Sequence, residues 1–226
     1  MCGRFTLFAP AAEVATLFGL SEVPDLTPRY NVAPSQPIAA VGLRPDGKTR
    51  GLSMLQWGFV PWWATDPNAG PRPINAPAEE VALRPPFKDS FPYRRCLIPA
   101  TGFYEWAGET EARVPYHFRP RDGGLLAFAG VWDAWQSRRP PVIDPPVLTS
   151  AIVTTVSVEP VRGVHDRMPM ILPPDRWAAW LDPSAAVIDL LPLLAPPVEG
   201  LLEAMRVGSA VNNVAIDGPE CLTPVA

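Results

Sequence analysis

The centre of the chain carries the stretch CLIPATGFYEW, residues Cys96–Trp106. Its residues alternate in the manner that is typical of a β-strand. The same pattern predicts further strands at Val114–Phe118, Leu125–Trp132 and Leu148–Val156. These strands follow one another without regular helices between them, which argues against a βαβ fold. We therefore expect an α+β fold in which β-strands dominate.

The first quarter of the chain has clear local signals. Ala11–Phe18 has an apolar pattern with helical spacing, and Gly19 after it is a residue that often ends helices. Ile38–Leu43 and Thr49–Trp57 predict two strands, and Asp46-Gly47 between them favours a tight turn. These segments therefore predict a short helix and a β-hairpin.

The other predicted elements are short as well. Cys2–Phe8 indicates a strand, and Arg29–Pro34 is extended because residues before proline avoid the helical region. Pro174–Leu181 predicts a helix with proline in its first turn, and Leu201–Val207 predicts a final strand. Ser137–Pro146 contains several Pro and Arg residues and is expected to be a surface loop.

Composition sets the size and the regularity of this fold. The chain has 226 residues, of which 47% are hydrophobic, and this is enough for one large domain with a sizeable core. Proline accounts for 31 residues, so long helices are not expected. No internal repeat or linker divides the sequence, and we expect a single domain that spans residues 1–226.

Charge and cysteine content argue against several classes of protein. The net charge of −4 argues against a globally basic nucleic-acid-binding protein, although 19 Lys and Arg residues allow a local basic groove. Three scattered cysteines are too few for a disulfide framework or a zinc site, which favours a reducing cytoplasm. The N-terminus lacks the features of a secretory signal, and the uncharged stretch Pro145–Val158 is too short to span a membrane.

Cys2 follows Met1, and a small residue at this position allows the initiator methionine to be removed. A mature N-terminal Cys2 would carry two nucleophiles, a free α-amine and a β-thiol. The amine can form a Schiff base with an aldehyde, and the thiol can close onto the imine to give a thiazolidine ring. An α-amine has an ordinary pKa of about 7.7–8.0, so roughly a tenth of it is neutral at pH 7. The alternative is a buried small hydrophobic residue, or one that only permits methionine removal.

Three more polar residues stand inside apolar or aromatic segments. Glu105 lies between Tyr104 and Trp106, either on a solvated strand face or in an apolar pocket that would raise its pKa and suit it to proton transfer. His165 titrates near neutral pH and suits proton transfer, although a lone histidine is more often structural. Asn75 either caps a turn or donates hydrogen bonds to a substrate.

Other reaction classes fit the sequence poorly. It contains no Gly-rich phosphate loop, no Gly-x-Ser-x-Gly elbow and no His-Glu-x-x-His zinc motif, and no metal or organic cofactor is expected. A thiol protease that pairs Cys2 with His165 is conceivable. The second histidine, His117, lacks charged neighbours, and we interpret it as structural.

Arginine and aromatic residues alternate in several segments of the chain. Single-stranded nucleic-acid sites combine a cationic groove with aromatic stacking surfaces, so this pattern favours such a site. The alternative is that the tryptophans belong to the core and the arginines are scattered over the surface. The segments are Arg4-Phe5, Arg29-Tyr30, Trp57 with Trp62-Trp63, and Tyr93-Arg94-Arg95.

A series of motifs in this order resembles the SOS response-associated peptidase family, whose members shield abasic sites in single-stranded DNA. Each motif alone is weak, but together they are highly specific and cover nearly the whole chain. They are Met1–Phe5, Pro28–Pro34, Trp57–Trp62, Ile74–Ala76, Arg94–Ala100, Gly102–Trp106, Ala129–Trp132, Thr154-Thr155, His165–Pro169 and Val211-Asn212.

This resemblance implies a covalent function. Cys2, exposed by loss of Met1, would form a thiazolidine crosslink with the ring-opened abasic sugar. His165 would assist ring opening of the sugar, and Glu105 would move protons and take part in removing Met1, a self-peptidase activity. Asn75 would hold the N-terminal residue or the sugar by hydrogen bonds. The implied fold is a compact α+β domain around a twisted, β-barrel-like mixed sheet with short peripheral helices.

The resemblance also implies partners. The protein would be a cytoplasmic monomer that joins the nucleoid when it binds single-stranded DNA with abasic sites, with replication-fork proteins as further partners. Pro77 stands where the family usually has an arginine that contacts DNA, so Arg72 or Arg84 would have to compensate. The expected DNA contacts are Arg4, Arg29, Asn31, Trp62, Arg94 and Arg167.

Two alternative functions stay open at this point. The first is a thiol or N-terminal-nucleophile peptidase that acts on other proteins. The second is a non-covalent module that reads modified or damaged bases. A heat-stable product with abasic DNA on a denaturing gel would separate the covalent function from both.

Overall fold

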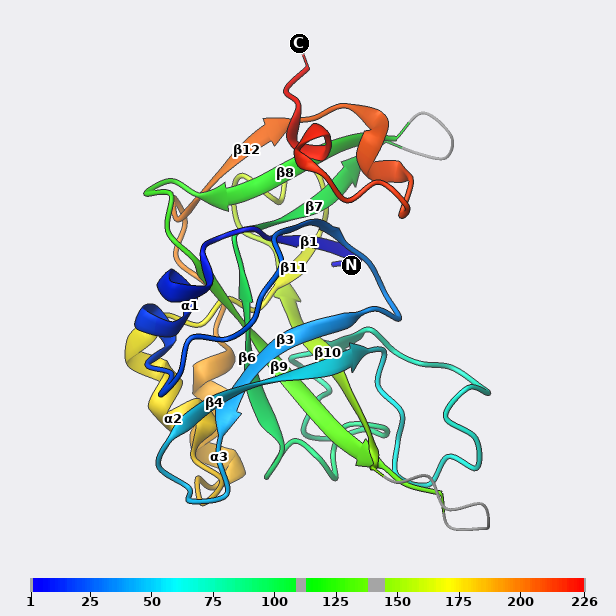
Figure 1. Cartoon of the computed structure of the whole chain (residues 1–226), viewed down its shortest axis with the longest axis vertical. Coiled ribbons are helices and arrows are strands. Elements are labelled where there is room, and N and C mark those ends of the chain that lie inside the picture. Colours follow the sequence, from blue (N-terminus) through cyan, green and yellow to red (C-terminus); the bar gives the residue numbers. More distant parts are fainter. Residues whose placement is uncertain (1, 109–112, 138–144, 226) are drawn as a thin grey trace.

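The run Cys96–Trp106 crosses from one β-sheet to another at Thr101 in the computed structural model, which describes residues 2–108, 113–137 and 145–225 (Figure 1). Strand β6 (Arg95–Ala100) lies in one sheet, and β7 (Gly102–Ala107) lies in the other. The crossing requires glycine after Thr101, since a Cβ atom on Gly102 would lie 2.4 Å from Nε2 of His117. The single strand expected from the sequence is therefore wrong, because tertiary pairing divides it.

The first sheet has five strands in the order β12-β8-β7-β1-β2, and every pairing in it is antiparallel. Strand β7 lies at its centre, between β1 and β8, so its residues are covered on both edges. Glu105 in this strand is 3% exposed, which excludes the solvated strand face that the sequence allowed. The other members are β1 (Arg4–Leu7), β2 (Arg29–Val32), β8 (Val114–Pro120) and β12 (Leu202–Arg206).

The second sheet contains a nearly closed ring. Strands β10, β4, β3, β6 and β9 follow one another, and β9 pairs again with β10. Within the ring, β3 and β6 share a single register pair, Val41↔Leu97. Strands β5 and β11 pair with the end of β10. Besides β6, the sheet contains β3 (Pro37–Leu43), β4 (Arg50–Trp57), β5 (Asn75–Pro77), β9 (Leu126–Trp135), β10 (Val147–Val156) and β11 (Arg167–Pro169).

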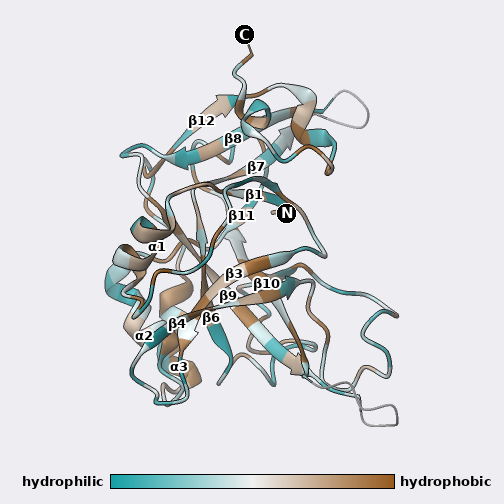
Figure 2. Cartoon of the chain, viewed as in Figure 1, coloured by the Kyte–Doolittle hydropathy of each residue, from teal (hydrophilic) through white to brown (hydrophobic). Residues whose placement is uncertain are grey.

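One hydrophobic core joins the two sheets. Phe5 of β1 packs edge to face on Trp57 of β4 and on Phe128 of β9, with ring centroids 5.4 and 6.0 Å apart. Phe103 of β7 contacts Phe128 in the same way. All four rings are buried, so their packing holds the first sheet against the ring. Figure 2 shows the hydrophobic segments of β3 and β9 inside the molecule.

The three α-helices in the described part of the chain lie on the side of the molecule away from the N-terminus (Figure 1). Helix α1 (Ala11–Phe18) ends at Gly19, which has the left-handed conformation with φ 64°. Phe18 stacks on Trp177 at 4.6 Å, and this contact fixes α1 against α2. The remaining helical segments are η2 (Pro174–Arg176), α2 (Trp177–Leu181), α3 (Val187–Leu190), η3 (Leu191–Leu194), η4 (Ser209–Asn212) and η5 (Pro219–Leu222).

Predictions that depend on neighbouring residues are largely confirmed, whereas those that depend on contacts between distant residues are less accurate. The hairpin around Asp46-Gly47, the helix Ala11–Phe18 and the final strand are present. The expected helix Pro174–Leu181 begins as a 3-10 turn and becomes α-helical only at Trp177. The short strands β5 and β11 were not expected, and most of the expected loop Ser137–Pro146 lies outside the described residues. Among the described helices, none is long and apolar enough to cross a membrane.

Candidate functional site

Asn75 and Cys2 are connected by a hydrogen bond. Nδ2 of Asn75 donates to the carbonyl oxygen of Cys2 at 2.9 Å. Asn75 begins β5, which runs parallel to β10 with Asn75 opposite Ile152, so the sheet fixes the amide. The side chain of Asn75 is only 7% exposed, and its Oδ1 has no hydrogen-bond partner among the described residues. Asn75 therefore holds Cys2 through Nδ2, and its Oδ1 is an acceptor, free among the described residues, close to Cys2.

The thiol of Cys2 is buried and uncharged. Burial raises the pKa of Cys2 far above its ordinary value, and the negative charge of Glu105 raises it further. The same coupling places the carboxyl group of Glu105 within electrostatic reach of the thiol. Cys2 is therefore buried, as the simpler reading of the sequence expected, but it lies beside an ionisable partner.

Glu105 occupies the apolar pocket that the sequence left as one of two alternatives. It is 3% exposed, and its strand β7 is covered on both edges by β1 and β8. Burial raises the pKa of Glu105 to about 7, and the charge of Asp166 acts in the same direction. A carboxyl group with this pKa is about half protonated at neutral pH, which suits a group that both accepts and donates protons.

His165 lies in the segment that leads into β11. Its Nδ1 accepts a hydrogen bond from the backbone N–H of Arg167 at 3.0 Å, which places the proton of the neutral ring on Nε2. Oδ1 of Asp166 is also 3.0 Å from Nδ1, but the Asp166 side chain is 88% exposed, so water screens its charge. Burial is the larger influence, and it lowers the pKa of His165. The ring is therefore neutral near pH 7.

The fold brings Asn75, Cys2 and Glu105 together from distant parts of the chain. Asn75 holds Cys2, and the charge of Glu105 acts on the Cys2 thiol. The exposed Asp166 has a small charge effect on Glu105 and lies 3.0 Å from His165. The cluster combines a thiol, a carboxyl group with a pKa near 7 and a neutral imidazole. Such a set can move protons at a carbon centre that Cys2 attacks.

Arg4 and Asn31, two of the expected DNA contacts, support the C-terminal segment. Nη1 of Arg4 donates to Oδ1 of Asn31 at 2.8 Å and to the carbonyl of Val211 at 2.6 Å. Nδ2 of Asn31 donates to the carbonyls of Val211, Asn213 and Ile216. Asn31 is fully buried, so its side chain has a structural role in this conformation, and a direct contact with DNA stays a prediction.

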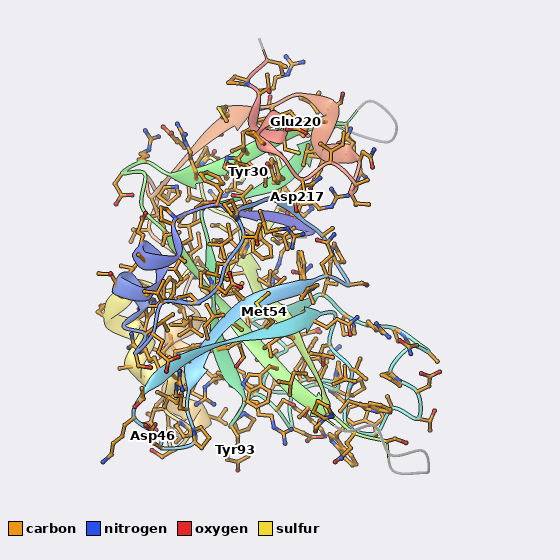
Figure 3. All side chains as sticks on the ribbon, in the orientation of Figure 1. Tyr30, Asp46, Met54, Tyr93, Asp217 and Glu220 are labelled. Atoms are coloured by element: carbon orange, nitrogen blue, oxygen red, sulfur yellow. The ribbon has the colours of Figure 1, made fainter. Side chains whose placement is uncertain are left out.

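Arg29, another expected DNA contact, also binds the C-terminal segment. Its Nε forms an ion pair with Oδ2 of Asp217, and its Nη2 donates to Gln36 at 2.6 Å. Oδ1 of Asp217 accepts the backbone N–H groups of Tyr30 and Asn31. Figure 3 shows Tyr30 and Asp217 side by side near the C-terminal segment. Sequence reasoning missed Asp217, because its partners precede it by more than 180 residues.

Trp62 and Arg94 lie in another part of the structure. The indole of Trp62 is 40% exposed, packs edge to face on Trp63, and donates to Asp89 at 3.3 Å. Arg94 is paired with the buried carboxyl group of Asp133, and its guanidinium lies 5.9 Å from the centre of the Trp132 ring. The exposed indole is available for stacking, whereas the charge of Arg94 is already partly neutralised.

Arg167 is the expected DNA contact nearest to His165 in the chain. Its two Nη atoms donate to the carboxyl oxygens of Glu79 at 2.8 and 2.9 Å, and Nη2 also donates to the carbonyl of Thr154 at 2.8 Å. Thr154 is also the register partner of Pro77. Arg167 therefore lies close to the position at which the sequence departs from the family pattern. Sequence reasoning missed this pairing, although Glu79 was visible two residues after Pro77.

The six expected DNA contacts thus form separate groups. Arg4, Arg29 and Asn31 hold the C-terminal segment, Arg167 lies beside the catalytic cluster, and Trp62 and Arg94 belong to the loops after β4 and before β6. Among the residues that the structure describes, no group of three or more His, Cys, Asp or Glu side chains could hold a metal ion.

Comparison with known proteins defines the class of this fold and site. A profile of the SOS response associated peptidase (SRAP) family matches residues 1–214, and the chain belongs to this family. Abasic site processing protein YoaM of Bacillus subtilis (strain 168) is 36% identical over 227 residues, which cover 98% of this chain and 97% of that protein. Abasic site processing protein YoqW of Bacillus phage SPbeta is also 36% identical over 227 residues, with 98% and 99% covered.

The fold is shared with solved structures. A crystal structure of a protein from Bacteroides thetaiotaomicron superposes with a TM-score of 0.85 over 100% of both chains, at 21% identity. A phage-related protein from Bordetella bronchiseptica gives a TM-score of 0.73 at 28% identity and covers 91% of this chain and 94% of its own. The expected α+β fold around a barrel-like sheet is confirmed.

Proposed function

We propose that this protein processes abasic sites in single-stranded DNA by forming a thiazolidine crosslink through Cys2 after removal of Met1. The observation that carries this proposal is the hydrogen bond from Asn75 to the Cys2 carbonyl, beside a carboxyl group with a pKa of about 7. The names of the bacterial and phage relatives, abasic site processing proteins, support the same substrate.

Because the thiol is buried and uncharged, the α-amine attacks first and the thiol second. The neutral α-amine of mature Cys2 adds to the aldehyde carbon of the ring-opened sugar, and loss of one water gives the imine. The thiol sulfur then adds to the imine carbon, while its proton passes to the imine nitrogen. One C–N and one C–S bond form in total, one water leaves, and no oxidant or reductant is needed.

Glu105 and His165 supply the protons for these steps. Glu105 can donate to the departing hydroxyl group and then accept the thiol proton, because its pKa of about 7 makes both directions accessible. The neutral imidazole of His165 carries its proton on Nε2 and can assist ring opening of the sugar by proton transfer. Asn75 keeps the Cys2 backbone in place, so the amine and thiol attack from one fixed position.

DNA binding in this proposal combines stacking with phosphate contacts. The exposed indole of Trp62 offers a surface on which a base can stack, and Arg167 can reach a phosphate if it leaves Glu79. Pro77 removes an arginine that the family usually has, and Arg167 lies near the same position of β10. The overall charge of −4 means that binding depends on these local groups and weakens as salt increases.

The alternative of a thiol peptidase is less well supported. A peptidase thiol needs a lowered pKa so that the thiolate is present, whereas burial and Glu105 raise the pKa of Cys2. Thiazolidine formation needs the thiol only after the imine has formed.

A denaturing gel tests the proposal directly. The mature protein, with Met1 removal verified by mass spectrometry, is incubated with single-stranded DNA that contains one abasic site. A heat-stable band of slower mobility is expected, with a mass equal to protein plus DNA minus one water. The Cys2→Ala variant should lose the thiazolidine, and the Cys221→Ala variant is the matched control, since Cys221 is a second buried cysteine. Equal crosslinking by Cys2→Ala would contradict the proposal.

A further inference from the structure

A cavity of about 540 Å³ lies beside the junction of β3 and β6 in the strand ring. Its lining includes Leu43 of β3 and Cys96 of β6, the two strands that share a single register pair. Trp132 of β9 and Leu148 of β10 complete the wall from the other ring strands. Cys2, Asn75, Glu105 and His165 do not line it, so this is a site separate from the catalytic cluster.

Figure 3 places the cavity at one end of the molecule. Tyr93, which lines it, and Asp46 of the neighbouring hairpin turn lie at the end opposite Tyr30 and Asp217. Mouths of β-barrels are frequent positions for small-molecule sites, and cavities of about 300–1,000 Å³ suit such ligands.

The two charged residues in the lining of the cavity are both arginines. Arg44 and Arg95 line it, and no Asp or Glu does, although acidic residues outnumber basic ones in the chain, 23 to 19. Arg44 forms a loose ion pair, 3.7 Å from Glu22, whose side chain is 77% exposed, and its charge also acts on the exposed Asp46. The cavity is therefore a local positive site in a negatively charged protein.

Arg95 is a buried cation that hydrogen-bonds backbone carbonyls, and the carboxylate charge of Asp182 acts on it through space. It is 5% exposed, and its guanidinium donates to the carbonyls of Trp180, Phe91 and Asp182. Each of its three nitrogen atoms makes one of these hydrogen bonds. Burial lowers its pKa to about 10, which keeps it charged at neutral pH. A buried positive charge that lines a cavity favours an anionic ligand.

Aromatic side chains also line the cavity. Tyr93 is 70% exposed and stands at the rim, and Trp132 forms part of the wall. Aromatic faces of this kind bind flat rings by stacking. Apolar residues such as Leu55 and Leu148 line the remainder. The cavity therefore combines a flat apolar surface with two guanidinium groups.

We propose that this cavity binds a small aromatic anion of mononucleotide size, with its phosphate or carboxylate near Arg95 and Arg44 and its ring against Tyr93 and Trp132. The same chemistry is present in a free mononucleotide and in the phosphorylated 5′ end of a DNA strand. The ligand is held without a covalent bond, and the catalytic cluster takes no part.

Isothermal titration calorimetry with 2′-deoxyadenosine 5′-monophosphate (dAMP) tests this site in the full chain. We expect one saturable site with a Kd below about 1 mM, and binding at least about ten-fold weaker for deoxyadenosine, which lacks the phosphate. Arg44→Glu should weaken dAMP binding about ten-fold, and Tyr93→Ala about five-fold. Arg95→Ala is avoided, because it would leave three buried carbonyls without donors and could unfold the chain.

Matched controls make the result decisive. Arg84→Glu changes the charge by the same amount at an exposed arginine outside the cavity and should leave dAMP binding unchanged. Cys2→Ala should also leave it unchanged, so failure of the crosslinking proposal would not affect this one. A 5′-phosphorylated single strand that binds more tightly than dAMP, in an Arg44-dependent way, would assign the site to strand ends. Absence of saturable binding, equal effects of Arg44→Glu and Arg84→Glu, or loss of binding in Cys2→Ala would overturn the proposal.

Discussion

Nδ2 of Asn75 lies 2.9 Å from the carbonyl oxygen of Cys2, and this bond connects residues that are 73 positions apart in the chain. Asn75 is itself fixed by the pairing of β5 with β10. The position of Cys2 is therefore set by the ring of strands and not by the N-terminal segment alone. Four of the relationships described above lead to specific tests.

Asn75→Ala should slow crosslinking while the protein stays folded. The variant loses one buried hydrogen bond, which costs about 1 kcal/mol of unfolding free energy. Misplacement of the Cys2 backbone should lower the crosslinking rate by about 10- to 100-fold. Single-turnover kinetics on abasic single-stranded DNA measure this rate. Asn68→Ala is the control, because Asn68 is exposed and its side chain accepts a hydrogen bond from Arg72. Equal rates for the two variants would show that the Asn75 bond does not position Cys2.

Glu105→Gln should stabilise the protein and abolish its chemistry. Burial raises the pKa of Glu105 from 4.5 to about 7, so the folded state holds a proton that the unfolded state releases at lower pH. The stability that this proton provides is complete below about pH 4.5 and is lost as the pH rises through about 7. The neutral variant avoids this loss, and one pKa unit corresponds to about 1.36 kcal/mol.

Thermal unfolding at two pH values measures this effect. Glu105→Gln should exceed the wild type by on the order of 3 kcal/mol near pH 8 and match it near pH 4. Glu80→Gln is a control at a partly exposed carboxyl group. A variant that is less stable than the wild type at pH 8, or one that crosslinks at the wild-type rate, would contradict the assigned role of Glu105.

Glu79→Gln should strengthen binding to single-stranded DNA. The hydrogen bonds from Arg167 lower the pKa of Glu79, so the pair is ionised at neutral pH and occupies the guanidinium. Loss of the carboxylate charge releases Arg167 for a phosphate, and the slope of log K against log salt should become steeper by about one. Fluorescence anisotropy over a salt series measures both quantities. Glu80→Gln removes the same charge at the next residue, and an equal gain in that control would show a general charge effect instead.

Asn31→Ala should destabilise the fold strongly. Asn31 accepts from Arg4 and donates to three carbonyls of the C-terminal segment, so its loss leaves buried groups without partners. The expected cost is about 2–4 kcal/mol of unfolding free energy in urea. Asn212→Ala, which removes one exposed bond to Trp106, should cost about 0.5 kcal/mol or less. An unchanged unfolding midpoint for Asn31→Ala would favour a role in DNA contact over a structural one.

Local elements of the fold were predictable because their causes lie within a few residues. The helix Ala11–Phe18 and its end at Gly19 follow from apolar spacing and from the left-handed conformation that glycine accepts. The hairpin around Asp46-Gly47 follows from turn chemistry. The stretch Cys96–Trp106 was correctly predicted to be extended, but nothing within it shows that β6 and β7 belong to different sheets.

The candidate site, like the fold, was predictable only in part. The sequence by itself determined which residue types are present, and the motifs around Cys2, Asn75, Glu105 and His165 indicated the family. Only the tertiary structure decided that Glu105 is buried with a pKa of about 7, and that Asn75 holds Cys2. The physical reason is that desolvation and strand pairing depend on neighbours far away in the chain, whereas residue type and local spacing do not.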